Sequence, residues 1–430
     1  MKQSTLALGL ACVCFSGAVL AQTPESEYHR FQSVEALANH PAVSIAMAAA
    51  REIDARSEAF LVELTEIPAP PFEEQARAIR FAELLGAAGL SDVVIDDVGN
   101  VLGRRPGTGG GPTVALVAHL DTVFPEGTDV TVSHRGERLY APGIGDDTRG
   151  LVLLLTMVQA LDEVGLDTLG DLLFVGSVGE EGLGDLRGVR HLFREDGPTI
   201  DAFIAIDGGS DSRVVNQALG SRRYLVTITG PGGHSWGDFG LGNPALALSR
   251  AMYLFDDAAA TVVNTGPVAS YSVGRLGGGT SVNAIPHESW AEVDLRSVDR
   301  GQLDRLDEVL AFAVERALDE QNRRRDRGDA LEAGLEAIGE RPSGMVASDH
   351  PLVVAAMEAT RHLGFVPRLG AASTDANIPI SLGIPAITLG RGGRGGGVHS
   401  LEEWWSGEGA YLAVQRALLV TLAAAGLVAP

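Results

Sequence analysis

The chain has 430 residues, of which 45% are hydrophobic and 21% are charged, as in an ordinary globular protein. This composition excludes a disordered or fibrous chain, and the length favours two domains because one hydrophobic core rarely grows so large. Acidic residues outnumber basic ones by 56 to 33, for a net charge of −23, which disfavours binding to nucleic acid or to an anionic membrane.

The N-terminal segment has the three parts of a secretory signal peptide. Lys2 supplies a positive charge, residues 6–15 are apolar, and residues 19–21 form a cleavage site that ends in a small residue. The apolar run is too short to span a membrane. We therefore expect residues 1–21 to be removed and the protein to be exported, to a periplasm or outside the cell, without a membrane span.

Both cysteines of the chain, Cys12 and Cys14, lie in this N-terminal segment. A lipoprotein signal at one of them is an alternative to the secretory signal, although neither has the sequence context that lipidation requires. The exported chain has no cysteine, so it forms no disulfide, and any metal site must use histidine and carboxylate ligands.

The first half of the chain alternates between strand-like and helix-like patterns. Residues 113–119 form a continuous apolar run, which is typical of a strand buried on both faces of a parallel sheet. Strands that alternate with helices predict an α/β sheet covered on both sides. In chain order, the pattern predicts helices over 43–65 and 73–85, strands over 93–95 and 113–119, a helix over 150–161, and strands over 172–176 and 202–206.

The pattern changes near residue 216 and changes back near residue 341. Alternation of polar and apolar residues predicts half-exposed strands over 224–229, 271–273 and 291–295, and an amphipathic helix follows over 302–318. The α/β pattern then resumes with a helix over 351–363, a strand over 386–389 and a helix over 409–425. We therefore expect a three-layer catalytic domain with a mostly parallel sheet, formed by residues 22–215 and 336–430, and an α+β domain inserted at 216–335.

Histidine and acidic residues follow the predicted strands of the α/β pattern. Each of these motifs alone has an ordinary explanation, since an isolated His-X-Asp is usually structural and a Glu-Glu pair is usually surface charge. Ligands of open α/β sheets gather at the carboxyl ends of the strands, so motifs at several strand ends can converge. The candidates are His119 and Asp121, the pair Asp146-Asp147, the pair Glu180-Glu181, Asp207, and His399 after a glycine-rich loop.

Two histidines and several carboxylates, without a thiol, suit zinc or a similar divalent ion. Five ligands that include one shared carboxylate suit a site with two metal ions about 3.5–4 Å apart.

The order of these motifs resembles the co-catalytic metallopeptidase family that contains aminoacylase, the glutamate carboxypeptidases, succinyl-diaminopimelate desuccinylase and peptidase T. The matching motifs are His119-Leu-Asp121-Thr, Gly145-Asp146-Asp147, Gly179-Glu180-Glu181-Gly, Asp207-Gly and His399-Ser. The resemblance implies that His119 and Asp207 bind one metal ion, that Glu181 and His399 bind the other, and that Asp146 bridges both. Both ions are expected to be zinc, with cobalt or manganese as alternatives.

The resemblance also implies roles for three neighbours of the metal ligands. The carboxylate of Asp121 is expected to accept the second ring N–H of His119 and so to set the tautomer. Glu180 is expected to be the general base that takes a proton from the metal-bridging water and passes it to the leaving amine. The peptide bond between Asp146 and Asp147 is expected to be cis.

The inserted segment resembles the dimerisation domain of the same family. Gly230-Pro-Gly-Gly-His234-Ser and Asn283-Ala-Ile-Pro286 carry the match, which implies a homodimer in which His234 and Asn283 reach the active site of the partner subunit. Arg296 resembles the arginine that binds the substrate carboxylate, with a surface salt bridge as the alternative.

Two glycine-rich segments near the C-terminus complete the expected pocket. Residues 370–377 resemble the loop that lines the substrate pocket of the family, with Thr374 and Asp375 as candidate substrate-binding residues. Residues 391–397 resemble an RGG segment that binds nucleic acid. The acidic net charge and the adjacent His399 favour instead a flexible loop that delivers a metal ligand.

The expected function is that of an exopeptidase, of the aminopeptidase or di- and tripeptidase type, because residues 373–377 and 390–399 look closest to peptidase T. An N-acyl amino acid deacylase or desuccinylase of the same fold is the first alternative, since its substrate presents a similar small amide with a carboxylate. A binding domain that has lost catalysis is the second alternative. It should lack some of the ligands, and here all five and Glu180 are present.

Overall fold

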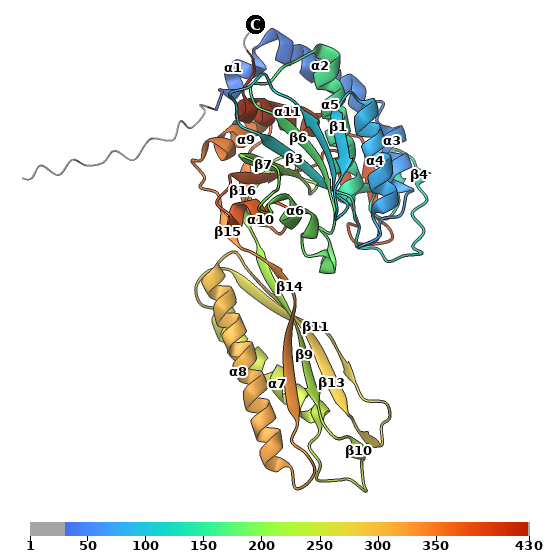
Figure 1. The fold of residues 1–430 in the computed structure, drawn as a ribbon, viewed down its shortest axis with the longest axis vertical. Coiled ribbons are helices and arrows are strands. Elements are labelled where there is room, and N and C mark those ends of the chain that lie inside the picture. Colours follow the sequence, from blue (N-terminus) through green and yellow to red (C-terminus); the bar gives the residue numbers. More distant parts are fainter. Residues whose placement is uncertain (1–30, 429–430) are drawn as a thin grey trace, which may run out of the picture. The chain divides into compact units, whose positions relative to one another are not determined.

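A nine-stranded sheet forms the centre of one of two regions of the chain, which we call the α/β region (Figure 1). The computed structural model describes residues 31–428, so the expected signal peptide lies outside the described residues. Along the sheet the strands are β1 (Ser91–Ile95), β2 (Val101–Arg105), β6 (Leu172–Ser177), β3 (Val114–His119), β7 (Ala202–Ile206), β17 (Ala386–Leu389), β8 (Arg213–Ala218) and β15 (Gly344–Met345), with β16 (Arg368–Ala372) paired to β8.

The four central strands β6, β3, β7 and β17 are parallel to one another. All of their residues are buried, as expected for strands that are covered by helices on both faces. The strands at both ends of the sheet pair antiparallel, as β1 does with β2 and β15 with β8. The prediction of an α/β fold with a mostly parallel central sheet is confirmed.

Helices pack around this sheet and share its hydrophobic core. The two most deeply buried helices, α5 and α11, both contact β3, and α2 packs against both of them. The helices of the α/β region are α1 (Val34–Ala38), α2 (Pro41–Asp54), α3 (Glu58–Thr65), α4 (Gln75–Ala87), α5 (Gly150–Val164), α6 (Arg187–Leu192), α9 (Pro351–His362), α10 (Asn377–Ser381) and α11 (Tyr411–Ala425).

The single helix predicted over residues 43–65 is wrong, because the chain turns between α2 and α3. The hydroxyl of Ser57 donates a hydrogen bond of 2.8 Å to the carbonyl of Asp54, and the amides of Arg56 and Ser57 bond to carbonyls only three residues back. Such local bonds satisfy the last carbonyls of α2 and end the helix.

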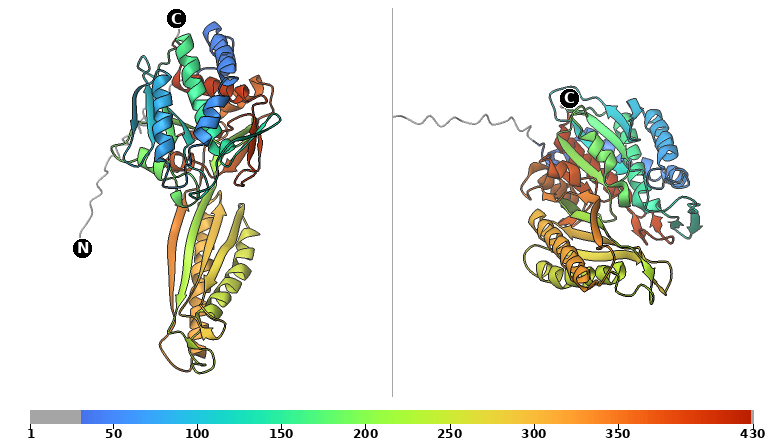
Figure 2. Two further views of the ribbon diagram at one scale, coloured as in Figure 1. Left: turned by 90° about the vertical axis from the view of Figure 1, so that its right-hand side faces the viewer. Right: turned by 60° about the horizontal axis from the view of Figure 1, so that its bottom comes forward.

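The chain between β8 and β15 forms a second region, which we call the inserted segment. Its antiparallel sheet has the order β11 (Ala269–Gly278), β13 (Glu288–Ser297), β9 (Gly220–Thr229) and β14 (Glu332–Arg341), and a short pair is formed by β10 (Gly233–His234) and β12 (Ala284–Ile285). The helices α7 (Pro244–Val263) and α8 (Arg300–Arg324) lie on one face of this sheet (Figure 2). Buried and half-exposed residues alternate along β13, so the other face is open, as predicted for an α+β segment.

The glycine-rich segment before His399 belongs to a small four-stranded sheet. Its strands are β18 (Arg394–Gly396), β19 (Trp404–Ser406), β5 (Arg138–Tyr140) and β4 (Ser133–Arg135). The indole N–H of Trp405 donates a hydrogen bond of 3.0 Å to the carbonyl of Gly392, and a Cβ on Gly393 would lie only 2.5 Å from the same ring. The prediction of a flexible loop is therefore wrong, since these glycines allow close packing in a hairpin.

Within residues 31–428, none of the helices is both long enough and apolar enough to span a bilayer.

Candidate metal centre

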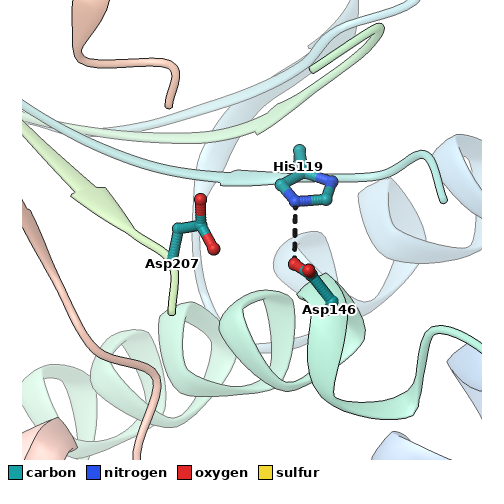
Figure 3. Close-up of side chains that lie close together, drawn as sticks. All are labelled: His119, Asp146 and Asp207. Atoms are coloured by element: carbon teal, nitrogen blue, oxygen red, sulfur yellow. Dashed lines mark ion pairs between the residues drawn. The ribbon is translucent and has the colours of Figure 1, made fainter. Parts of the chain in front are cut away.

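The strand ends bring three of the predicted metal ligands together (Figure 3). His119 is the last residue of β3, Asp207 directly follows β7, and Asp146 lies in an irregular turn, Ile144–Arg149, just before α5, where its backbone angles are not helical. One ligand atom of each side chain lies within 4.8 Å of the others, and the Nε2 atom of His119 is 3.3 Å from Oδ1 of Asp146. This distance between ligand atoms is short enough for one ion to contact all three.

The other oxygen of Asp146 faces a second group of predicted ligands. Nε2 of His399 lies 2.9 Å from Oε1 of Glu181 and 3.3 Å from Oδ2 of Asp146. Asp146 therefore presents Oδ1 to His119 and Oδ2 to His399, as a carboxylate shared between two ions must. The structure brings all five predicted ligands together, in two groups that meet at Asp146.

The donor atoms fit a divalent metal ion. Nε2 of His119 is buried and has no hydrogen-bond partner, although it faces carboxylates from two sides. A buried nitrogen of this kind offers a lone pair to a metal, and nitrogen and carboxylate oxygen are ligands that zinc accepts. The peptide bond between Asp146 and Asp147 is cis, as the resemblance implied.

Asp121 holds the site in a different way from the one predicted. Its carboxylate lies 3.8 Å from Nδ1 of His119, and the ring nitrogen is instead 2.9 Å from the backbone carbonyl of Asp121. The carboxylate oxygens accept the backbone N–H groups of Glu180 and Glu181, at 3.0 and 2.8 Å. The predicted contact was wrong because the chain turns after β3 and points this side chain at the loop that follows β6. The carbonyl still sets the tautomer that leaves Nε2 free.

Glu180 lies beside the candidate metal ligands and forms an ion pair with Arg341. Nη1 of Arg341 is 2.9 Å from Oε1 of Glu180, and both side chains are buried. Burial raises the pKa of Glu180 well above its ordinary value, and the positive charge of Arg341 partly opposes this rise. Arg341 was not predicted from the sequence. It is the last residue of β14, and only the pairing of β14 with β9 places it here.

A small pocket of roughly 170 Å³ opens onto both ligand groups and onto Glu180. Arg296, predicted to bind a substrate carboxylate, lies on its wall, while its Nε is also 2.6 Å from Asp294. The pocket is lined by Asp146, Glu180, Glu181, Gly182, Asp207, Arg223, Arg296, Arg341, Ser373 and His399.

Thr374 and Asp375 do not line this pocket, although they were predicted to bind substrate. Both are buried: the hydroxyl of Thr374 is 2.8 Å from that of Thr388, and Ser177 donates a hydrogen bond of 2.5 Å to Asp375. Burial raises the pKa of Asp375 to about 6. Ser373 is the residue of this segment on the pocket wall, whereas the side chains of Thr374 and Asp375 contact Thr388 of β17 and Ser177 of β6.

His234 and Asn283 lie next to each other in the inserted segment. The amide of Ser235 donates a hydrogen bond of 2.9 Å to the carbonyl of Asn283, and the exposed ring of His234 accepts two backbone N–H groups through Nδ1. Neither residue lines the pocket of its own chain. Their role at the site of a partner subunit stays a prediction.

His399 stands at the tip of the hairpin in a strained backbone conformation. Its φ is 65°, in the left-handed region that residues other than glycine rarely adopt. Hydrogen bonds to Asp146 and Glu181 raise the pKa of His399 to about 10. The hairpin therefore holds this ring against the carboxylates at a cost in backbone energy, as is common at functional sites.

Glu403, four residues further on, is a second residue that sequence reasoning missed. Its buried carboxylate accepts the backbone N–H groups of Gly143, Gly145 and Asp146, at 2.8, 3.0 and 2.9 Å. A Cβ on Gly145 would lie 2.9 Å from Oε1, so glycine is needed for this approach. Glu403 thus fixes the turn that carries Asp146. Its signal in the sequence is weak, because a Glu-Glu pair after a loop looks like surface charge.

This fold, with two histidines and three carboxylates gathered beside the ends of its parallel strands, defines the class of α/β proteins that bind divalent metal ions. The family model described as peptidase family M20/M25/M40 matches residues 115–424, and the chain belongs to that family. The resemblance seen in the sequence is confirmed.

The chain is similar to one curated relative in sequence and to several solved structures in fold. Carboxypeptidase G2 from Pseudomonas sp. (strain RS-16) is 27% identical over 205 residues, which are 46% of this chain and only 47% of that relative. Aminopeptidase PepT from Bacillus cereus has the same fold, with a TM-score of 0.70 at 20% identity over 86% of this chain and 99% of that one. A tripeptidase from Staphylococcus aureus has a TM-score of 0.71 at 23% identity over 85% and 97%.

We predict that Glu403→Gln lowers the free energy of unfolding by about 2–3 kcal/mol, because the amide cannot accept all three buried N–H groups. Chemical denaturation with and without metal measures this loss. Glu402→Gln is the matched control: its side chain is 75% exposed and should change stability by less than about 0.5 kcal/mol. Equal effects of the two substitutions would contradict the role given to Glu403.

Proposed function

We propose that this protein is an exported two-metal hydrolase that cuts the amide bond of small peptides, as an aminopeptidase or a di- and tripeptidase. The position of Glu180 carries the proposal. One of its carboxylate oxygens lies within 4.8 Å of ligand atoms of His119 and of Glu181, which belong to different ligand groups. Glu180 thus lies beside both ligand groups but belongs to neither proposed ligand set. In this position its carboxylate can transfer a proton from a water molecule at the site to the leaving amine.

The residues of the site divide the work of amide hydrolysis among them. His119, Asp146 and Asp207 would hold one divalent ion, and Asp146, Glu181 and His399 would hold the other. When bound, zinc, or cobalt or manganese in its place, supplies Lewis acidity toward water and the substrate carbonyl.

Glu180 removes the proton from the attacking water and returns it to the leaving amine. Its raised pKa helps in both directions, because a base with a pKa nearer neutrality also serves as an acid.

Three arginines on the pocket wall favour a substrate that carries a carboxylate. Arg223, Arg296 and Arg341 approach the pocket from strands of the inserted segment. Guanidinium groups bind carboxylates through paired hydrogen bonds, and the small volume of the pocket favours a short substrate. A di- or tripeptide meets both conditions, and so does an N-acyl amino acid, which keeps the deacylase or desuccinylase alternative. A binding domain without catalysis is disfavoured because no ligand is missing.

The test of this function compares wild-type protein with two variants. Wild-type protein loaded with zinc should hold about two ions per chain and cleave di- and tripeptides faster than N-acyl amino acids. Glu180→Gln should keep its metal and lose about 10²–10⁴-fold in kcat, because only proton transfer is removed. Asp146→Ala should lose metal, as measured by elemental analysis.

The outcomes separate the proposed roles. Loss of metal in Glu180→Gln would overturn the division between base and ligand. Faster cleavage of N-acyl amino acids than of peptides would favour the deacylase. Wild-type protein without metal and without amidase activity would end the enzyme hypothesis.

We also propose that the protein is a homodimer in which His234 and Asn283 serve the partner subunit. The exposed position of His234, away from the pocket of its own chain, supports this. Mixing inactive His234→Ala with inactive Glu180→Gln should restore activity after subunit exchange, because a mixed dimer holds one site with Glu180 and the partner's His234. No recovery, or a molecular mass of one chain in sedimentation, would contradict the proposal.

Export is proposed from the pattern of residues 1–21. N-terminal sequencing of the mature protein should begin at Gln22. A mature protein that keeps Lys2 would show that the segment is not removed.

A further inference from the structure

The buried side chain of Arg391 contacts the carboxylates of one of the two ligand groups, His119–Asp146–Asp207. Nη1 of Arg391 lies 2.9 Å from Oδ1 of Asp146 and 3.3 Å from Oδ1 of Asp207. It also lies 3.8 Å from Oδ1 of Asp147, which is fully buried beside the site. The side chain of Arg391 is only 5% exposed, so its charge is not screened by water. A permanent positive charge therefore touches two of the three side chains that would hold one metal ion.

The fold holds Arg391 in this place. It is the second residue after β17, which pairs parallel to β7, so it leaves the sheet beside Asp207. Its backbone N–H donates a hydrogen bond of 2.9 Å to the carbonyl of Gly208. A Cβ on Gly145 would lie 3.4 Å from Nη2, so the guanidinium also packs against the turn that carries Asp146. Contacts with both segments fix the charge on one side of the site.

The second ligand group contacts Arg391 through Asp146, the carboxylate that both groups share. In the part of the chain that the structure describes, no ion pair joins Glu181 or His399 to an arginine. Arg341 is bonded to Glu180, which is outside both ligand sets. Arg391 binds Oδ1 of Asp146, the oxygen on the His119 side, whereas Oδ2 faces His399. The two groups thus share a carboxylate but differ in electrostatic surroundings.

We propose that Arg391 is a positioning residue that acts as a fixed counter-charge for Asp146 and Asp207 and makes the His119–Asp146–Asp207 position the weaker of the two metal positions. The inference rests on the proposed two-metal function. A divalent cation that enters this position is repelled by the guanidinium and must share carboxylate oxygens that already accept its N–H groups. The Asp146–Glu181–His399 position meets less of this repulsion and fills first.

The same contacts give Arg391 an opposite effect on the protein without metal. Buried carboxylates that lose the counter-charge of Arg391 repel one another more strongly and destabilise the fold. Replacing Arg391 by a neutral residue should therefore lower the thermal stability of the metal-free protein and raise the affinity for metal. If Arg391 had only a structural role, its replacement would lower both the thermal stability and the affinity for metal. The sign of the change in metal affinity therefore distinguishes a counter-charge from a structural residue.

The experiment titrates Co²⁺ into metal-free protein by calorimetry. Wild-type protein should bind two ions in unequal steps. His399→Ala isolates the His119–Asp146–Asp207 position, and adding Arg391→Gln in that background should tighten Co²⁺ binding at least about tenfold, because a nearby unit charge is removed. In a His119→Ala background, the same substitution should have a smaller effect. If Arg391→Gln folds only with Co²⁺ bound, competition with a chelator measures the same affinity from the loaded protein.

Two further variants control for charge and for substitution. Arg394→Gln changes an arginine three residues away whose side chain is 62% exposed, and it should leave both affinities unchanged. Arg391→Lys keeps the positive charge and should tighten Co²⁺ binding less than Arg391→Gln does.

Several results would overturn the inference about Arg391. One is Co²⁺ binding that is unchanged or weaker in the Arg391→Gln variants. Another is an equal change in Co²⁺ affinity in the His399→Ala and His119→Ala backgrounds. A third is Co²⁺ binding that tightens as much with Arg391→Lys as with Arg391→Gln. Wild-type protein that binds no Co²⁺ would overturn the proposed metal function as well, and two bound ions without an effect of Arg391 would overturn this inference alone.

Discussion

The parallel pairing of β6, β3, β7 and β17 is the constraint on which the site depends. The register sets His119 opposite Ser177 and Leu389 opposite Ile206, so the segments that follow these strands leave the sheet along one edge. All residues of the four strands are buried, and a strand buried on both faces cannot slip in register without exposing apolar side chains. The hydrophobic core therefore places the candidate ligands, although most of them lie on loops.

Several buried carboxylates lie close together at this edge of the sheet, and their negative charges would repel one another without compensating contacts. Two kinds of contact compensate these charges. Asp121 and Glu403 accept backbone N–H groups from the loops that carry the ligands, while Arg341 and Arg391 place positive charge against carboxylates. Removing one partner of a buried ion pair typically costs about 3–5 kcal/mol, so these contacts maintain the shape of the site as well as its charge.

The inserted segment takes part in the site through its strand ends. Arg341, the last residue of β14, forms an ion pair with Glu180. Arg223 of β9 and Arg296 of β13 line the same pocket as Arg341. The proposed base and the proposed carboxylate-binding residues therefore depend on the same antiparallel sheet. A change in the position of that sheet would alter proton transfer and substrate binding together. This is a physical reason to expect coupling between them.

The sequence by itself determined the alternation of strands and helices and the buried parallel strands, because burial patterns are local features. With the motif order of a resembling family, the sequence indicated five candidate metal ligands. It also indicated Glu180. Tertiary structure alone decided the contacts of Asp121 and the places of Arg341, Arg391 and Glu403. The partners described for Arg341, Arg391 and Glu403 at the site lie 161 to 260 residues away. An arginine or glutamate in a glycine-rich or acidic segment looks like solvated surface until strand pairing buries it. Local patterns record which residues are buried in an element, whereas these contacts exist only once distant elements have packed.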